Sequence, residues 1–369
     1  MKLLMVTGLG SAKDLASGRK GAFYNTLEEF HKHWERIDIL APRDKNEVSR
    51  DRILFGNVFV HVSPWPLIFH PFWFLKKGRE IHKEQKFDMM TVQDFPPFYN
   101  GIGARFLWQK IKVPYILEIH HIPGYPKASN LKEKIYANKI IWMLYWKVFS
   151  SKAAAVRTVN QKQTPEFLKN IGIPKNKIIY IPSMYIDLEV FKLLDLPKEY
   201  NLIFVGRLAE NKGISLFLEA VKILNTKAIV VGDGPLRDWA QLQIKKYKLP
   251  IINFGWANNS QEIAKLLNQS KILIMPSYNE GGPRVVLEAM ACGVPVLTTN
   301  VGLMPDFADK NTVKTIDWSV RDIVSKAKEL LENENERNRL KQAGLEVVKQ
   351  FEKKEMIKNY AEKIGAICK

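Results

Sequence analysis

Short β-branched runs alternate with amphipathic helical stretches along almost the whole chain of 369 residues. Such alternation is typical of parallel sheets whose faces are covered by helices. The pattern breaks once, near residues 193–200, where Asp195, Pro197 and Lys198 interrupt it. Because a chain of this length exceeds one ordinary domain, the break predicts two α/β domains, residues 1–194 and 195–349. We expect the last helix, residues 350–369, to pack back on the first domain.

The predicted strands are runs of apolar and β-branched residues bounded by polar or turn residues. In the first domain they are 2–7, 37–41, 58–62, 89–92, 115–119 and 154–158. In the second they are 201–205, 228–231, 251–254, 272–275, 294–298 and 312–315. Helices are expected at 22–34, 215–224 and 262–269, near 283–290 and, at the end of the chain, over 349–367. Two such doubly wound domains would leave a cleft where their strand ends face each other.

The segment 275–299 carries the densest chemical information. Gly281 and Gly282 leave the backbone bare for close approach of a ligand, and Pro283 suits a first helical turn. The unpaired N–H groups of that helix would favour an anion. Glu280 and Glu288 frame the helix start, and each carboxylate can accept two hydrogen bonds from sugar hydroxyls. The alternative is a solvated capping Glu280 and a surface Glu288.

A second segment, 204–213, places two cations where a strand ends. Arg207 and Lys212 lie five residues apart, after Gly206. Arginine offers a bidentate fork to phosphate and lysine a point charge, so the pair suits a diphosphate. Taken alone, the pair is better explained by two solvated surface cations. The turns 232–235 and 254–258 also follow strands, and ordinary turns explain them equally well.

Together these segments resemble the retaining GT-B glycosyltransferases of the large E-x7-E family (glycosyl transferases group 1, GT4-like). Glu280 and Glu288 match the spacing of that pattern, and residues 206–213 match its G-R-L-x-x-x-K-G segment. The resemblance is strong over residues 200–306 and loose over residues 1–190. It implies two Rossmann-like domains facing across a cleft, and a hexosyltransferase that takes a nucleotide-diphosphate sugar of the UDP or GDP type, with no cofactor.

The resemblance also implies a role for each matching position. Glu288 would bind the donor ribose, Glu280 would contact the sugar ring, and the backbone of 281–285 would line the sugar and phosphate pocket. Trp256 or Asn258 would hold the nucleobase. The implied donor-binding residues are Gly206, Arg207, Lys212, Trp256, Asn258, Glu280, Gly281, Gly282, Pro283, Val285, Glu288 and Gly21.

The catalytic residues implied by the resemblance are Glu280, His120, Arg207 and Lys212. His120 follows a predicted strand, as does the family's histidine near the donor sugar. The adjacent His121 is the alternative, and a structural histidine is a further one. No protein nucleophile stands out, so we expect the family's same-face substitution, in which two cations stabilise the leaving diphosphate without a metal.

Three segments depart from the family. Gln93 and Asp94 stand where a histidine-containing turn is usual, and Ser183 and Met184 stand where Asn and Gly are usual. After the signature block a second Gly is absent, and Asp306 replaces a Glu.

Charge raises the question of partners. The chain carries 56 Lys and Arg against 38 Asp and Glu, a net charge of +18, and residues 101–186 alone hold 14 basic and 3 acidic residues. Aromatic runs at 65–75 and 140–147 lie beside lysines and arginines, as suits the boundary of an anionic membrane. The acceptor would then be a glycan, lipid-linked or close to a membrane. Core helices with solvated basic ends are the alternative.

The remaining bulk features bear on location and on competing functions. Two cysteines without a CxxC pair, and an N-terminus without the features of a signal peptide, predict a cytoplasmic protein, peripheral on the inner face of the cell membrane. A nucleic-acid binder would explain the charge, but no zinc finger or RNP-like segment is found, so no nucleic-acid partner is expected. A GT-B sugar-nucleotide epimerase is the other alternative, against which the E-x7-E block argues.

Overall fold

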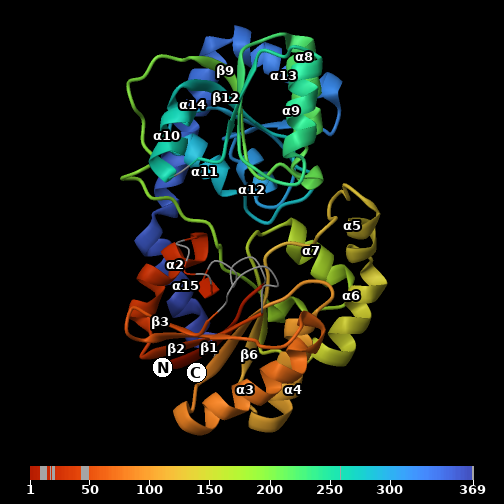
Figure 1. Ribbon diagram of the computed structural model, residues 1–369, viewed down its shortest axis with the longest axis vertical. Helices are drawn as coiled ribbons and strands as arrows, with labels where there is room; N and C mark the ends of the chain where they lie inside the picture. The colour runs from red at the N-terminus through yellow and green to blue at the C-terminus, as the bar shows by residue number, and fades with distance from the viewer. Residues whose placement is uncertain (9–14, 17, 19–20, 43–49, 258, 368–369) are drawn as a thin grey trace.

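The computed structural model describes residues 1–8, 15–16, 18, 21–42, 50–257 and 259–367. Two mostly parallel sheets, each covered by helices on both faces, form two α/β domains stacked one above the other (Figure 1). Tyr180 ends the last strand of the first sheet and Tyr200 begins the first strand of the second. The expected division at 194 and 195 therefore falls in the segment that joins the sheets.

The first sheet has eight strands in the order β3-β4-β2-β1-β5-β6-β7-β8. All neighbouring pairs are parallel except β3 with β4. The strands are β1 Lys2–Val6, β2 Arg36–Ala41, β3 Arg52–Leu54, β4 Val58–Val62, β5 Met89–Gln93, β6 Tyr115–Ile119, β7 Ala155–Thr158 and β8 Ile178–Tyr180. Strands β3 and β8, three residues each, were not predicted.

The second sheet has six strands in the order β11-β10-β9-β12-β13-β14. They are β9 Tyr200–Val205, β10 Ala228–Val231, β11 Ile251–Gly255, β12 Ser270–Met275, β13 Val296–Thr299 and β14 Lys314–Ile316. Numbered from β9, this is the Rossmann order 3-2-1-4-5-6, in which the direction of winding reverses between β9 and β12. Ligands of open α/β sheets bind at such a reversal, outside the carboxyl ends of the strands.

The strands are apolar on both faces, so helices must cover both faces of each sheet. On β1, Leu3 and Met5 face one apolar layer, while Leu4 and Val6 face the other. The helices of the first domain are α2 Ala22–Phe30, α3 His70–Gln85, α4 Tyr99–Ile111, α5 Leu131–Tyr136, α6 Lys139–Tyr145 and α7 Gln163–Asn170. Those beside the second sheet are α8 Ile214–Leu224, α9 Arg237–Lys246, α10 Ser260–Asn268, α11 Arg284–Ala291, α12 Met304–Ala308, α13 Val320–Glu332 and α14 Glu334–Val348.

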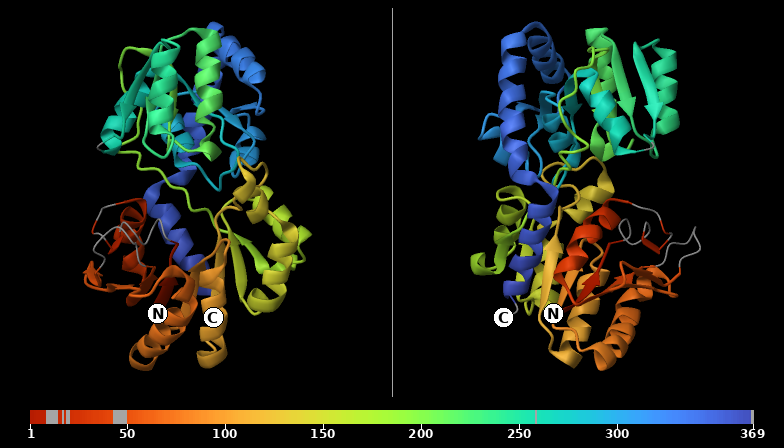
Figure 2. Two further views of the ribbon diagram at one scale, coloured as in Figure 1. Left: turned by 45° about the vertical axis from the view of Figure 1, so that its right-hand side comes forward. Right: turned by 90° about the vertical axis from the view of Figure 1, so that its left-hand side faces the viewer.

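The last helix, α15 Lys353–Ile367, lies beside α2 on the first sheet (Figures 1 and 2). The sequence predicts one continuous helix over 349–367, but the structure interrupts it at Glu352. There the chain pairs with the linker, because Ile186 N donates to Phe351 O at 2.7 Å and Lys353 N donates to Ile186 O at 3.0 Å. The chain therefore crosses between the domains twice at one place. Within the described residues, no helix combines the length and apolarity needed to cross a bilayer.

Candidate active site between the two sheets

The structure brings together two predicted site residues that are far apart in sequence. Lys212 lies in the loop after β9, Glu280 lies in the loop after β12, and the lysine ammonium contacts the glutamate carboxylate directly. Both side chains are largely buried, at 25% and 11% exposed. Because β9 and β12 flank the reversal of the second sheet, the pair occupies the ligand-binding edge of that domain.

Backbone contacts hold the two loops in register. Tyr278 N donates to Asn211 O at 2.8 Å, so the loop that carries Glu280 is tied to the loop that carries Lys212. Between them Gly213 has a left-handed φ of +69°, and a Cβ there would lie 2.2 Å from Pro276 O. Only glycine meets both conditions, which explains the residue that precedes α8.

The same loop also contacts the first domain. The Asn279 side chain donates to Glu133 Oε2 at 2.8 Å and to Lys127 O at 3.1 Å. A Cβ on Gly281 would lie 2.2 Å from His120 O. The Gly281–Gly282 segment, whose backbone the sequence predicts to be open to a ligand, therefore lies directly against the end of β6.

Glu288 lies one turn into α11, whose N-cap is Pro283. Burial raises the pKa of its carboxyl to about 7, partly opposed by Arg284. Near neutral pH this carboxyl can therefore donate or accept a hydrogen bond, whereas the sequence predicts only a carboxylate that accepts.

The other predicted donor residues are less enclosed. Arg207 is exposed at the end of β9, and Trp256 is 70% exposed after β11. Gly21 is the N-cap of α2. Gly206 and Val285 are partly buried, next to the cation loop and within α11 respectively. Asn258 lies outside the described residues.

The two adjacent histidines have different surroundings. Nε2 of His120 lies 3.8 Å from Glu118 Oε2, and its side chain lines a cavity between the domains. Burial lowers the pKa of His121, with Glu280 and Lys212 among the charges that act on it. His121 therefore lies within electrostatic reach of the Lys212–Glu280 pair, so both histidines belong to the site.

A buried network of Glu118, Arg157 and Tyr360 lies next to His120. Arg157 Nη1 donates to Glu118 Oε1 at 2.7 Å, and the Tyr360 hydroxyl of α15 donates to the same oxygen at 2.6 Å. Burial alone would raise the pKa of Glu118, but Arg157, with help from His120 and Tyr360, lowers it to about 2. The carboxylate is therefore ionised, and its Oε1 accepts both hydrogen bonds.

Arg157 also fixes the linker between the domains. Its guanidinium donates to Ile181 O and Pro182 O, each at 3.0 Å. Sequence reasoning missed Glu118, Arg157 and Tyr360, since they lie on β6, β7 and α15 and meet only in the tertiary structure. The only sign of them in the sequence was that Glu118 and Arg157 are charged residues inside predicted apolar strands.

These features define a class of protein: two Rossmann-like domains of the GT-B architecture, with an ion pair at the ligand edge of the second domain and histidines facing it from the first. The most informative structural comparison is sucrose-phosphate synthase of Thermosynechococcus elongatus, which has a TM-score of 0.80 and 18% identity. The alignment covers 100% of this chain and 98% of that one. At this identity the likeness concerns the fold.

Residues 186–347 match the family model described as "Glycosyl transferases group 1". An uncharacterized glycosyltransferase of Methanocaldococcus jannaschii is 26% identical, over 80% of this chain and 82% of its own length. The UDP-Gal:alpha-D-GlcNAc-diphosphoundecaprenol alpha-1,3-galactosyltransferase of Escherichia coli is 25% identical, over 60% of each chain. Residues 186–347, which include the Lys212–Glu280 pair, are therefore similar to the group 1 glycosyltransferases.

Proposed function

We propose that the protein transfers a hexose from a nucleoside-diphosphate sugar to a glycan acceptor with retention of anomeric configuration. The observation that carries the proposal is the Lys212–Glu280 pair at the reversal of the second sheet, with Arg207 on the same loop. A cation loop and a carboxylate at this edge suit a diphosphate joined to a sugar. The donor is of the UDP or GDP type, and the Escherichia coli relative is named for UDP-Gal.

The proposed reaction is a same-face substitution. The acceptor hydroxyl oxygen forms a bond to the anomeric carbon while the bond from that carbon to the diphosphate oxygen breaks. The hydroxyl proton passes to the leaving diphosphate oxygen. Arg207 and Lys212 stabilise the negative charge that develops there, so no metal is required for this step. Glu280 and a histidine, His120 or His121, orient the sugar.

The part of the acceptor beyond its reacting sugar is assigned to a second cavity, in the first domain. It has a volume of about 350 Å³ and lies between the ends of β1 and β5, where the winding of the first sheet reverses. Asp94 lines it, and burial raises the pKa of that carboxyl to about 7, while Tyr145 donates a hydrogen bond to it. Leu67, Lys132 and Tyr136 complete one side. A protonatable carboxyl, aromatic rings and a lysine suit a sugar that is joined to an anionic or apolar group.

The two aromatic runs also carry exposed apolar side chains, and Leu67 of the first run lines this cavity. Ile68, Phe72 and Leu144, from the two aromatic runs, are 62%, 55% and 54% exposed. Trp73, Phe74 and Trp142 from the same runs are buried, so each run is half core and half surface. Beside them lie Lys76, Lys77, Arg79, Lys132, Lys134 and Lys139. We infer a peripheral association with an anionic, cytoplasmic membrane face and a lipid-linked acceptor, in line with the diphosphoundecaprenol named for one relative.

Nucleotide binding is the first test of the proposed function. A thermal-shift screen against UDP, GDP and ADP, alone and as their sugars, is expected to raise the melting temperature with one nucleotide. At 100 times Kd the stabilisation is about 2.7 kcal/mol. Donor turnover should then require acceptor. Turnover to an isomerised sugar without acceptor would instead support the epimerase, and the absence of any nucleotide effect would contradict both.

Membrane association has its own test. The protein is expected to sediment with phosphatidylglycerol vesicles at low salt and to remain in solution with phosphatidylcholine vesicles. Ile68→Ser with Phe72→Ser and Leu144→Ser should weaken binding at least about tenfold, since each exposed side chain loses apolar burial of about 1.5–3 kcal/mol. The matched control replaces Ile223 and Leu242, which are 61% and 59% exposed on the second domain. Equal binding of the two variants would contradict the assignment.

A further inference from the structure

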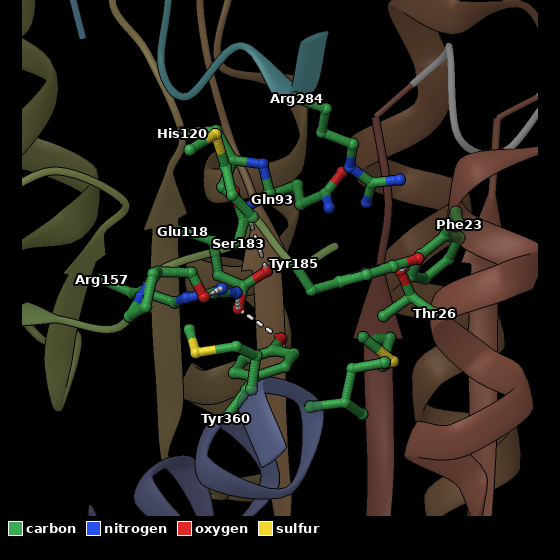
Figure 3. A pocket seen from close by; sticks show the side chains of 15 residues that line it. Phe23, Thr26, Gln93, Glu118, His120, Arg157, Ser183, Tyr185, Arg284 and Tyr360 are labelled. Atoms are coloured by element: carbon green, nitrogen blue, oxygen red, sulfur yellow. Dashed lines mark hydrogen bonds and ion pairs between the residues drawn. The ribbon is translucent and has the colours of Figure 1, made fainter. Parts of the chain in front are cut away.

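A cavity of about 170 Å³ lies between the two domains and is lined by His120 (Figure 3). Its described walls come from β1, β5, β6, β7 and α2 of the first domain, from the linker, from α15, and from α11 of the second domain. The polar side chains Gln93, His120 and Ser183 line it together with Arg284, the first residue of α11. Neither Arg207 nor Lys212 is among the described residues of its walls.

The charges of this cavity do not balance. Glu118 also lines it, but this carboxylate is already bonded to Arg157, which lines the cavity as well. Among the described residues, no carboxylate lies within ion-pair distance of the Arg284 guanidinium. Glu288, one turn further along α11, acts on Arg284 only at longer range. Among the described residues, the walls of the cavity therefore carry a net positive charge from Arg284.

Neighbouring side chains hold Arg284 in place. Its guanidinium carbon lies 4.5 Å from the ring centroid of Tyr185. The Tyr185 hydroxyl is hydrogen-bonded to Thr26 Oγ1 at 3.1 Å, which fixes the ring beneath the guanidinium. An arginine that stacks on an aromatic face still has its N–H fork available at the edge, and that fork matches a carboxylate in bidentate geometry.

We propose that this cavity binds one sugar unit that bears a carboxylate, with Arg284 as the bidentate partner of that carboxylate. The inference rests on the glycosyl transfer proposed above and names the substrate class for it. Gln93, Ser183 and His120 supply donors and acceptors for the hydroxyls of the same unit. The volume lies below the roughly 300–1,000 Å³ of pockets for larger ligands, so it suits a single sugar rather than a nucleotide.

The carboxylate can belong to the transferred sugar or to the acceptor sugar, and calorimetry distinguishes the two. The donor arm compares UDP-glucuronate with UDP-glucose and GDP-mannuronate with GDP-mannose. The acceptor arm compares methyl glucuronide with methyl glucoside in the presence of the nucleoside diphosphate. We expect the wild type to prefer the acid at least about tenfold in one arm, since a charged, hydrogen-bonding site discriminates strongly against an analogue that lacks the group.

The variant Arg284→Gln should reduce this preference to within about twofold while leaving the affinity for UDP or GDP unchanged. Arg284→Lys should restore part of it, because the charge returns without the fork. The matched control is Arg321→Gln, an exposed arginine on α13, and melting temperatures check the folding of all variants.

Two results would overturn the proposal. One is that the wild type prefers no acid in either arm although it binds UDP or GDP. The other is that Arg284→Gln loses nucleoside diphosphate affinity, which would make Arg284 a ligand of the diphosphate. If neither nucleotide binds the wild type, the proposed function itself fails.

Discussion

Replacing Lys212 by Ala is expected to lower turnover at saturating donor by about 10²–10³-fold, the effect of removing one fixed group that stabilises developing charge. The ammonium lies at the edge of the sheet where the winding reverses between β9 and β12, and Glu280 holds it there. Arg207→Ala should have an effect in the same direction, because the exposed guanidinium follows β9 on the same loop.

The measurement is the rate of nucleoside diphosphate release from the donor that the thermal-shift screen identifies. Lys265→Ala, at an exposed position of α10, is the matched control and should retain full turnover. Glu280→Gln separates the members of the pair: it should impair turnover while preserving affinity for the free nucleoside diphosphate, because Lys212 is kept. If Lys212→Ala turns over donor at the wild-type rate, the assignment of the diphosphate to this loop is wrong.

The second large effect concerns stability. Glu118→Ala is expected to lower the free energy of unfolding by about 3–5 kcal/mol, because it leaves Arg157 charged and unpaired in the interior. Replacing both residues, with Glu118→Leu and Arg157→Met, should restore most of the loss, since apolar substitutes for a buried pair are often neutral. Tyr360→Phe removes one hydrogen bond and should cost about 1 kcal/mol.

The pH dependence gives the same network a second test. The pKa of Glu118 is about 2 in the folded protein and 4.5 ordinarily, so its stabilising contribution is complete above pH 4.5 and is lost as pH falls towards 2. Urea unfolding between these pH values should show a smaller acid loss for the double variant than for the wild type. An equal acid loss, or a Glu118→Ala variant as stable as the wild type, would contradict the network.

The alternation of strands and helices made the two α/β sheets predictable, because each central strand is apolar on both faces. Strands β3 and β8 escaped detection because three residues are too few to show a period. The interruption at Glu352 was equally hidden, since the cause is pairing with Ile186, 166 positions earlier, rather than a local helix-breaking residue.

The candidate site likewise contains residues that the sequence predicts and residues that it does not. Glu280, Arg207 and Lys212 were predicted from two continuous segments, each of which matches a motif of the family that the sequence resembles. Arg284 lies inside one of these segments, yet nothing in the sequence indicates that its side chain lines a cavity with Gln93 and Ser183. Only the packing of the two domains brings those three residues together.

The central claim is that a nucleoside diphosphate binds to the cation loop after β9. Isothermal titration calorimetry with UDP and GDP tests it most directly, on the wild type, Lys212→Ala and Lys265→Ala. The account predicts that one nucleotide binds the wild type and the Lys265 variant equally, and binds the Lys212 variant at least about tenfold more weakly. Equal affinity in all three proteins, or no binding of either nucleotide to the wild type, would contradict it.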